Sequence, residues 1–311
     1  MKRTLSRWLP AATMALVLAV TACSSATRAK SSSTTRPPVR IASTSTVAES
    51  TTSSSSTTVP PPSTGVPPTT VTVPVVRAVP APSSIMIIGD SGMFDASPAI
   101  EALYRALGTT TVVNVAFPGV GFTNFSGWRT AWPGLVATSR PQLIVAMIGG
   151  WDFGYVQAHG GAAYEAVLNS ATAILTAAGG RILWLGMPPP TKPANLASTL
   201  DPLLQLSAAR HPGIAAYADP ATVLTALNGT TPRWLPDATG HLVLVRKPDD
   251  WHFCPDGAVR VADFIGAVVA QLGWGPAPRP GWENGSWRAD HRYNDPPGSC
   301  DTTLPQNAPA P

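Results

Sequence analysis

The chain lacks the concentrated positive charge that nucleic-acid-binding proteins carry. Its 311 residues have a formal net charge of only +4 at pH 7. Eight of the 21 lysines and arginines fall within residues 1–80, which contain one acidic residue, Glu49. The rest of the chain therefore has a net charge of −3, and its basic residues are scattered. This distribution argues against a nucleic-acid partner.

Long apolar segments are also scarce. The apolar run over residues 9–20 is too short to span a bilayer, but it follows three basic residues, as a secretory signal core does. It ends at Val20-Thr21-Ala22-Cys23, which resembles the lipobox of bacterial lipoproteins, in which the cysteine is acylated and becomes the mature N-terminus. We therefore expect residues 1–23 to be a lipoprotein signal peptide with Cys23 as the lipidation site. The alternative is a soluble secreted protein that is cleaved nearby.

The next segment, residues 24–82, has few side chains that can build a core. It consists mostly of Ser, Thr, Pro and Val, with tracts such as Ser53–Ser56 and Pro60–Pro62. Such a composition buries too little apolar surface to offset the entropy lost on ordering. We predict a disordered stalk, suited to O-glycosylation, that lets the following domain work within a cell wall.

Cysteine is rare, with three residues in the whole chain. If Cys23 carries lipid, Cys254 and Cys300 are the remaining pair, and an exported protein meets an oxidising compartment. We expect a Cys254–Cys300 disulfide that tethers residues 275–311 as a C-terminal tail. Two unpaired thiols are the alternative.

Residues 83–274 alternate strand-like and helix-like patterns. The predicted strands cover residues 85–88, 111–115, 143–148, 181–185 and 214–217, and the predicted helices cover residues 98–107, 162–177 and 257–272. Strands separated by helices imply parallel, right-handed crossovers. We therefore expect a three-layer α/β/α sandwich with a central parallel five-stranded sheet.

One of these strands leads directly into a candidate reactive group. The apolar run Ile85-Met86-Ile87-Ile88 is typical of a strand buried on both faces, and it stops at Gly89-Asp90-Ser91. Residues just beyond such a strand face the ligand crevice of an open α/β sheet, so Ser91 is a candidate nucleophile held in a turn. Alone, Gly-Asp-Ser is better explained as an ordinary turn. The distant stretch Asp249-Asp250-Trp251-His252 strengthens the first interpretation, because it offers a base and a carboxylate to orient that base.

Four separated segments together resemble the SGNH, or GDSL-type, hydrolase family. They are Gly89-Asp90-Ser91, Gly119 after the second strand, Gly149-Gly150-Trp151-Asp152 after the third, and Asp249-Asp250-Trp251-His252 near the end. The resemblance covers roughly residues 84–273, and the segment Trp251–Ala258 is similar to the extracytoplasmic actinobacterial branch, which includes domains fused to membrane acyltransferases. It implies a flavodoxin-like SGNH hydrolase fold that acts on ester bonds, and no cofactor is expected.

The resemblance implies a catalytic triad. A serine hydroxyl is a poor nucleophile at neutral pH, so Ser91 needs an imidazole, here His252, to accept its proton. Asp249 would orient the imidazole and stabilise the imidazolium. Asp250 is the rival for this role, and the family spacing favours Asp249.

The same resemblance suggests donors for the oxyanion that forms during acyl transfer. The backbone N–H groups of Ser91 and Gly119 are candidates, although Gly119 is also explained as a turn glycine. Trp151 stands where the family has an asparagine whose side chain donates a hydrogen bond. An indole N–H is also a donor, so Trp151 either replaces that asparagine or serves as a packing or substrate-platform residue.

Six acidic and histidine residues near the end of the chain might suggest a metal site, but they match no compact ligand spacing. They are Asp237, His241, Asp249, Asp250, His252 and Asp256. We therefore expect no metal.

Together these features predict a cell-surface serine esterase or O-acyltransferase that acts on ester-linked acyl groups of envelope glycans or lipids. Cys23 would anchor it to the outer face of a bacterial cell membrane, or the protein would be secreted if it is not lipidated. Trp151 motivates an alternative, a catalytically weak or inactive binding lipoprotein on the same fold. A structural lipoprotein that anchors the cell wall is a third possibility.

Overall fold

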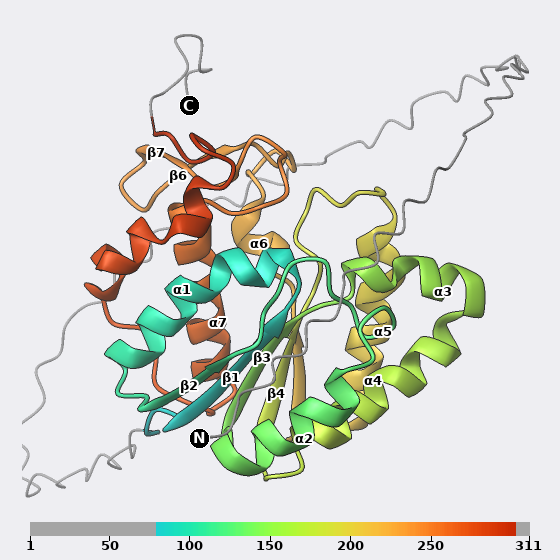
Figure 1. The fold of residues 1–311 in the computed structure, drawn as a ribbon. Helices are drawn as coiled ribbons and strands as arrows, with labels where there is room; N and C mark the ends of the chain where they lie inside the picture. Colours follow the sequence, from blue (N-terminus) through green and yellow to red (C-terminus); the bar gives the residue numbers. More distant parts are fainter. Residues whose placement is uncertain (1–78, 303–311) are drawn as a thin grey trace, which may run out of the picture. The chain divides into compact units, whose positions relative to one another are not determined.

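The structure, a computed structural model, describes residues 79–302 (Figure 1). Its central sheet has five parallel strands in the order β2-β1-β3-β4-β5. The strands are β1 (Ser84–Gly89), β2 (Thr111–Asn114), β3 (Leu143–Met147), β4 (Arg181–Leu185) and β5 (Ala215–Ala218). The predicted signal peptide, the lipidation site Cys23 and all but the end of the predicted stalk lie outside the described residues.

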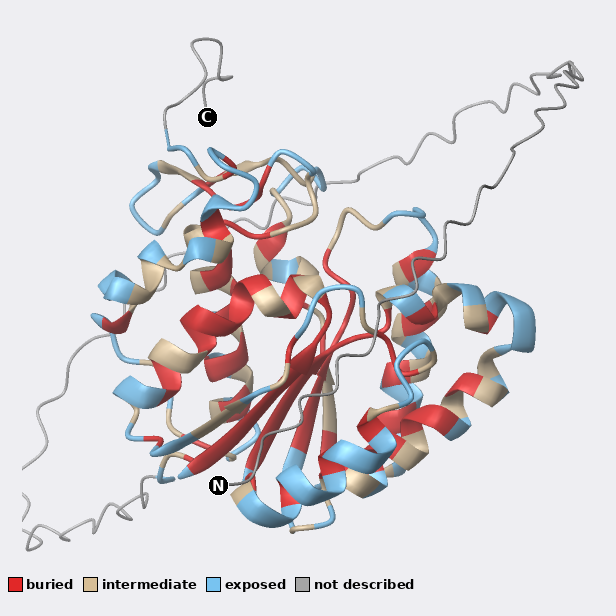
Figure 2. Ribbon diagram, viewed as in Figure 1, coloured by how far each residue is buried: buried red, intermediate tan, exposed pale blue. Residues whose placement is uncertain are grey.

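Apolar side chains form the centre of this sheet. The four residues Ile85–Ile88 of β1 are 0% exposed, and every residue of β3 is buried. Figure 2 shows these central strands as buried along their length. Successive side chains of a strand point to opposite faces, so full burial requires that both faces of the sheet are covered.

Helices provide this cover in two layers (Figure 1). On one face, α1 (Ser91–Ala106) packs against α7 (Pro255–Gln271). The other face carries α2 (Trp128–Ser139), α4 (Gly161–Leu175) and α5 (Leu196–Arg210). The predicted three-layer α/β/α fold with a parallel five-stranded sheet is therefore confirmed.

The direction of the chain across the sheet reverses between β1 and β3. From β1 the chain crosses to β2, whereas from β3 it proceeds through β4 to β5 on the other side. Ligands of open α/β sheets bind outside the carboxyl ends of the strands at such a switch point. Asp90-Ser91 and Gly149–Asp152 follow the two strands that flank this point.

The five predicted strands are all present, with ends that differ by at most one residue, and the predicted helices over 162–177 and 257–272 correspond to α4 and α7. Several elements were not predicted: α2, α5, α3 (Phe153–His159), α6 (Ala221–Leu224) and an antiparallel pair, β6 (Trp234–Pro236) with β7 (Leu242–Leu244). None of the helices in residues 79–302 combines the length and apolar character needed to cross a bilayer.

The helix predicted over residues 98–107 begins much earlier, at Ser91. Pro98 suggested a helix start, yet it lies inside α1, where its missing N–H leaves the carbonyl of Phe94 without its usual donor. Two side chains donate to this carbonyl instead, Ser97 Oγ at 2.9 Å and Arg292 Nη1 at 2.7 Å. The helix therefore continues through the proline.

Arg292 belongs to the C-terminal tail, which packs back onto the helical layer formed by α1 and α7. The tail forms three short 3-10 helices, η2 (Trp282–Asn284), η3 (Ser286–Ala289) and η4 (His291–Asn294). Trp282 and Tyr293 are 8% and 3% exposed and join the hydrophobic core. The structure also contains the predicted Cys254–Cys300 disulfide, which joins the tail to the start of α7.

Removal of this disulfide should lower the free energy of unfolding by about 4 kcal/mol, because the bridge restricts the unfolded chain across a sequence separation of 46 residues. Urea unfolding of the wild type and of the double variant Cys254→Ala/Cys300→Ala measures the loss. Dithiothreitol should reproduce the loss in the wild type and leave the double variant unchanged. A difference below about 1 kcal/mol would contradict this account of the tail.

Candidate active site

Ser91 is held at the junction between β1 and α1. The strand ends at Gly89, where an added side chain would collide with Met93 on α1 and with the backbone of Met147 on β3. Asp90 then caps the helix, because its side chain accepts a hydrogen bond from Gly92 N at 3.1 Å. Ser91 is therefore the first residue of a 16-residue helix rather than part of a simple turn.

This position suits a group that carries negative charge during a reaction. The first N–H groups of a helix have no partner within the helix, and the helix dipole places partial positive charge at this end. The backbone N–H of Ser91 is one of these groups. The side chain of Ser91 is half-buried at the carboxyl end of β1.

His252 and Asp249 lie together in the loop before α7. His252 Nδ1 lies 2.5 Å from Asp249 Oδ2. The other carboxylate oxygen, Asp249 Oδ1, accepts the backbone N–H groups of Trp251 and His252, both at 3.0 Å. When Nδ1 carries the proton and donates it in a hydrogen bond to this carboxylate, Nε2 of the neutral imidazole can accept a proton.

The hydrogen bonds around Asp249 keep it ionised. Burial alone would raise the pKa of Asp249, but the hydrogen bonds from the imidazole of His252 and from the backbone N–H groups of His252 and Trp251 outweigh burial. The pKa is therefore lowered from the ordinary value of an aspartate. An ionised carboxylate at this position can stabilise an imidazolium.

Asp250, the rival for this role, makes different interactions. Its backbone has φ of 64°, a left-handed conformation that aspartate tolerates better than most residues. Its N–H donates to the carbonyl of Lys247 at 3.1 Å, and its charge acts on the buried guanidinium of Arg246. The carboxylate that contacts the imidazole is therefore that of Asp249.

Ser91 and His252 line the same pocket, which has a volume of about 310 Å³. The pocket is lined by residues that follow β1, β3 and β4 and by residues of the loop before α7. Its lining residues are Asp90, Ser91, Gly150, Trp151, Lys192, Leu196, Trp251 and His252. In the part of the chain that the structure describes, no hydrogen bond joins Ser91 to His252.

The other two predicted oxyanion donors differ in position. Trp151 lines the pocket and is 57% exposed. Gly119 is exposed on the loop after β2, where its φ of 82° requires glycine, and it is not among the lining residues. Its carbonyl accepts a hydrogen bond from the Asn124 side chain at 2.9 Å.

Asp152, the last residue of the Gly149–Asp152 segment, has a structural position that the sequence reasoning missed. It is 0% exposed and accepts hydrogen bonds from Phe122 N at 2.9 Å and Thr123 N at 2.8 Å. The hydroxyl of Tyr164 donates to it as well, at 2.9 Å. The carboxylate thus fixes the loop after β2 against the end of β3, next to Gly119 and Trp151.

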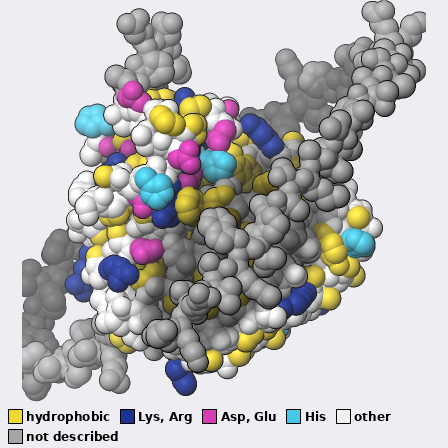
Figure 3. Space-filling view, in the orientation of Figure 1, with side chains coloured by type: hydrophobic (Ala, Val, Ile, Leu, Met, Phe, Trp, Pro, Cys, Tyr) yellow, Lys and Arg dark blue, Asp and Glu magenta, His cyan; other side chains and the backbone are white. Residues whose placement is uncertain are grey.

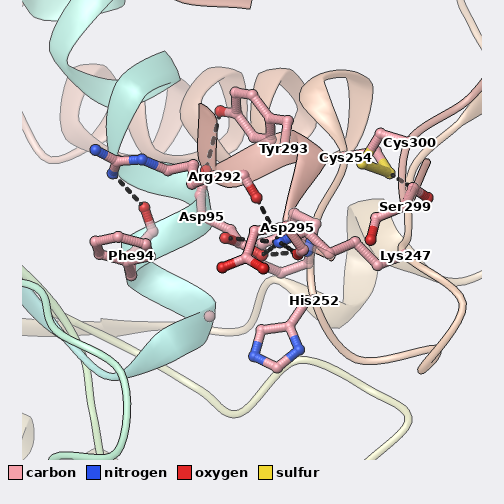
Figure 4. A network of polar contacts seen from close by, with 12 residues as sticks. Phe94, Asp95, Lys247, His252, Cys254, Arg292, Tyr293, Asp295, Ser299 and Cys300 are labelled. Atoms are coloured by element: carbon pink, nitrogen blue, oxygen red, sulfur yellow. Dashed lines mark hydrogen bonds and ion pairs between the residues drawn. A yellow bond between two sulfur atoms is a disulfide. The ribbon is translucent and has the colours of Figure 1, made fainter. Parts of the chain in front are cut away.

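A second network, also missed, lies next to His252 (Figure 4). Asp95 of α1 forms a buried ion pair with Lys247, with 3.0 Å between Asp95 Oδ2 and Lys247 Nζ. The same Asp95 oxygen accepts the backbone N–H of Phe253, the residue after His252, at 3.2 Å. The helix that begins with Ser91 is therefore bonded to the loop that carries His252.

The C-terminal tail completes this network. Lys247 Nζ donates to the backbone carbonyls of Arg292 at 2.8 Å and Asp295 at 3.1 Å, and the Tyr293 hydroxyl donates to the Asp95 carbonyl at 2.9 Å (Figure 4). These bonds satisfy the ammonium group, whose side chain is 7% exposed. The tail is thus part of the support for the site.

Lys192 was also not predicted, although it lines the pocket. It lies in the loop after β4, and its ammonium group donates to the backbone carbonyl of Asp249 at 3.0 Å.

Acidic and histidine side chains gather in the upper part of the face in Figure 3, whereas Lys and Arg are dispersed. Within residues 79–302, no three His, Cys, Asp or Glu side chains converge in a way that would hold a metal ion.

The fold and this site define an α/β/α protein with a serine, a histidine and an aspartate grouped at the switch point of a parallel sheet. The chain belongs to the family described as "Protein of unknown function (DUF459)", whose pattern matches residues 84–267. No curated protein matches the chain.

The chain is also similar to several solved structures. One is the crystal structure of TesA, with 20% identity, coverage of 61% of this chain and 99% of that chain, and a TM-score of 0.44. Another is a family 3 carbohydrate esterase of Clostridium thermocellum, with 11% identity, 61% and 96% coverage, and a TM-score of 0.45. A third is the periplasmic domain of a lipopolysaccharide acetyltransferase of Salmonella ser. Paratyphi A, with 12% identity, 60% and 84% coverage, and a TM-score of 0.39.

The buried carboxyl of Asp90 predicts a pH dependence of stability. Burial raises the pKa of Asp90 from 3.8 to about 6, although the N–H groups of Gly92 and Gly150 oppose this. Between these values the folded state binds more protons than the unfolded state, so stability falls as pH rises. Relative to Asp90→Asn, the wild type should lose about 2 kcal/mol of unfolding free energy between pH 4 and pH 7.

Urea unfolding at several pH values measures this difference. Asp295→Asn, which removes an exposed carboxylate, serves as the matched control and should follow the wild type. Parallel curves for the wild type and Asp90→Asn would show that the carboxyl of Asp90 has no raised pKa.

Proposed function

We propose that this protein is a serine esterase or O-acyltransferase that works through an acyl-enzyme on Ser91. The observation that carries the proposal is the shared pocket. Ser91, at the N-terminus of α1, and His252, paired with Asp249, both line it. A hydroxyl, an imidazole and an ionised carboxylate in this order are the groups that acyl transfer requires.

The first half of the reaction forms the acyl-enzyme. Ser91 Oγ attacks the acyl carbonyl while its proton passes to Nε2 of His252, and Asp249 stabilises the resulting imidazolium. The tetrahedral intermediate then collapses, the bond to the alcohol breaks, and His252 protonates the leaving oxygen. In the second half, water or a sugar hydroxyl attacks the acyl-enzyme and gives its proton to His252. The bond between the acyl group and Ser91 Oγ then breaks, and His252 returns the proton to Oγ.

The oxyanion needs fixed donors at the point where charge develops. The Ser91 backbone N–H is suited to this by its place at the helix terminus. We assign the second donor to the Gly119 N–H, on a loop that Asp152 holds through Phe122 and Thr123. We assign the third to the Trp151 indole, which has no hydrogen-bond partner within residues 79–302.

We further propose that the enzyme acts outside the cytoplasm, on ester-linked acyl groups of envelope glycans or lipids. The Cys254–Cys300 disulfide supports an oxidising compartment, since such bonds are rare in the cytosol. The lipobox-like sequence before Cys23 and the Ser/Thr/Pro-rich residues 24–82 support a lipid anchor followed by a stalk.

A binding protein on the same fold is the second candidate. Trp151 favours it, because a large exposed indole at the site is suited to contact with a bound ligand. Such a protein would bind an acylated glycan or lipid and would lack turnover.

Ser91→Ala and His252→Ala should each lower kcat/KM for p-nitrophenyl acetate by at least about a thousandfold, because either change removes the activated nucleophile. Asp249→Asn should lower it by about a hundredfold or more, because the imidazole loses its charged partner. Asp250→Asn is the matched control, one residue away, and should stay within about threefold of the wild type. Ser286→Ala, at an exposed serine, controls for the loss of a hydroxyl.

Steady-state hydrolysis by the purified protein measures these values. Full activity in Ser91→Ala or His252→Ala would remove the triad from the mechanism. If the wild type hydrolyses none of a broad panel of esters, the binding protein is the better interpretation.

A further inference from the structure

A second pocket, with an apolar lining, lies next to the pocket that Ser91 and His252 line. We call the latter the catalytic pocket. The second pocket has a volume of about 330 Å³, and it lies between α2, the loop after β2 and the ends of β1 and β3. All its lining residues are apolar side chains or glycines. Trp128 and Trp132 of α2, which are 1% and 5% exposed, line it from the core. We call it the apolar pocket.

The rim of the apolar pocket is unusually apolar for an exposed surface. Phe117 is 64% exposed, Phe125 is 45% exposed and Leu135 is 36% exposed, and all three line the pocket. Exposed apolar groups of this size that gather at one opening mark a binding site more often than scattered ones do. The opening is therefore suited to an apolar ligand.

Two chain segments run from one pocket to the other, and a third lies beside the assigned oxyanion donors. In the first, Ile88 and Gly89 line the apolar pocket, and the next two residues, Asp90 and Ser91, line the catalytic pocket. In the second, Ile148 lines the apolar pocket, while Gly150 and Trp151 line the catalytic pocket.

The third segment is the loop after β2. Val120 and Gly121 line the apolar pocket, and they directly follow Gly119, the oxyanion donor assigned above. The apolar pocket is thus adjacent to the catalytic pocket on the side of the oxyanion donors.

The stereochemistry of acyl transfer indicates which part of the substrate lies in each pocket. His252 protonates the leaving alcohol, so the alcohol must lie on the side of His252, in the catalytic pocket with Lys192 and Trp251. The acyl chain leaves the carbonyl carbon in another direction. On the side of the oxyanion donors it meets the apolar pocket.

From these observations we infer that the apolar pocket binds the acyl chain of the substrate, and that the preferred substrates carry medium-length aliphatic acyl groups rather than acetyl groups. This inference rests on the proposed function. Each methylene removed from water should raise kcat/KM by about three- to fourfold until the pocket is filled.

The test compares p-nitrophenyl octanoate with p-nitrophenyl acetate. For the wild type, kcat/KM should be at least a hundredfold higher for the octanoate. Ala131→Phe, which adds a ring to an exposed residue that lines the apolar pocket, should reduce this ratio at least tenfold. Ala137→Phe is the matched control, because Ala137 is also exposed on α2 but lies outside the apolar pocket, and it should keep the ratio.

A binding measurement separates failure of the inference from failure of the proposed function. Calorimetric titration of the Ser91→Ala protein with sodium decanoate should show binding that Ala131→Phe weakens at least tenfold and Ala137→Phe does not. If the wild type hydrolyses neither ester but decanoate binds in this way, the proposed function fails and the assignment of the apolar pocket as a binding site for an aliphatic chain stands.

Two results would overturn the inference itself. One is ester hydrolysis with the same octanoate-to-acetate ratio in the wild type and in Ala131→Phe. The other is that decanoate does not bind, while Ala131→Phe sediments differently from the wild type. This surface would then be a contact between two copies of the chain.

Discussion

The site depends on the buried ion pair between Asp95 and Lys247. Asp95 lies one turn after Ser91 on α1 and also accepts the N–H of Phe253, next to His252. One carboxylate therefore connects the helix that begins with Ser91 to the loop that carries His252. Leaving such a buried charge without its partner typically costs several kcal/mol, so the two elements are not free to separate. The tail, held by Lys247 and by the disulfide, closes this network from outside.

The two pockets at the switch point differ in their lining. The pocket beside His252 has charged and aromatic groups, and in the proposed reaction it would hold the leaving alcohol. The pocket beside α2 is apolar, and in the proposed reaction it would hold the acyl chain. The carbonyl carbon would lie between them, above the N-terminus of α1. A parallel sheet suits this division, because its strands deliver several unrelated segments to one edge.

Much of this arrangement could be predicted from the sequence because it is encoded locally. The apolar run before Ser91 and the spacing of Asp249 and His252 are short-range patterns. The helices α2 and α5 were missed because Pro133 and Pro202 lie inside them, against the usual rule for prolines. Asp95 and Lys247 were missed because they are 152 residues apart and nothing local pairs them. The location of the two pockets likewise follows from packing, which the sequence does not display.

The most direct test of the central claim is covalent labelling of the nucleophile. A fluorophosphonate ester reacts with an activated serine by forming an Oγ–phosphorus bond and releasing fluoride, and mass spectrometry of the digested protein locates the adduct. The account predicts a single adduct, on the peptide that contains Ser91, and its loss when His252 is replaced by alanine. An adduct on a different residue, or labelling of Ser91 at the same rate without His252, would contradict it.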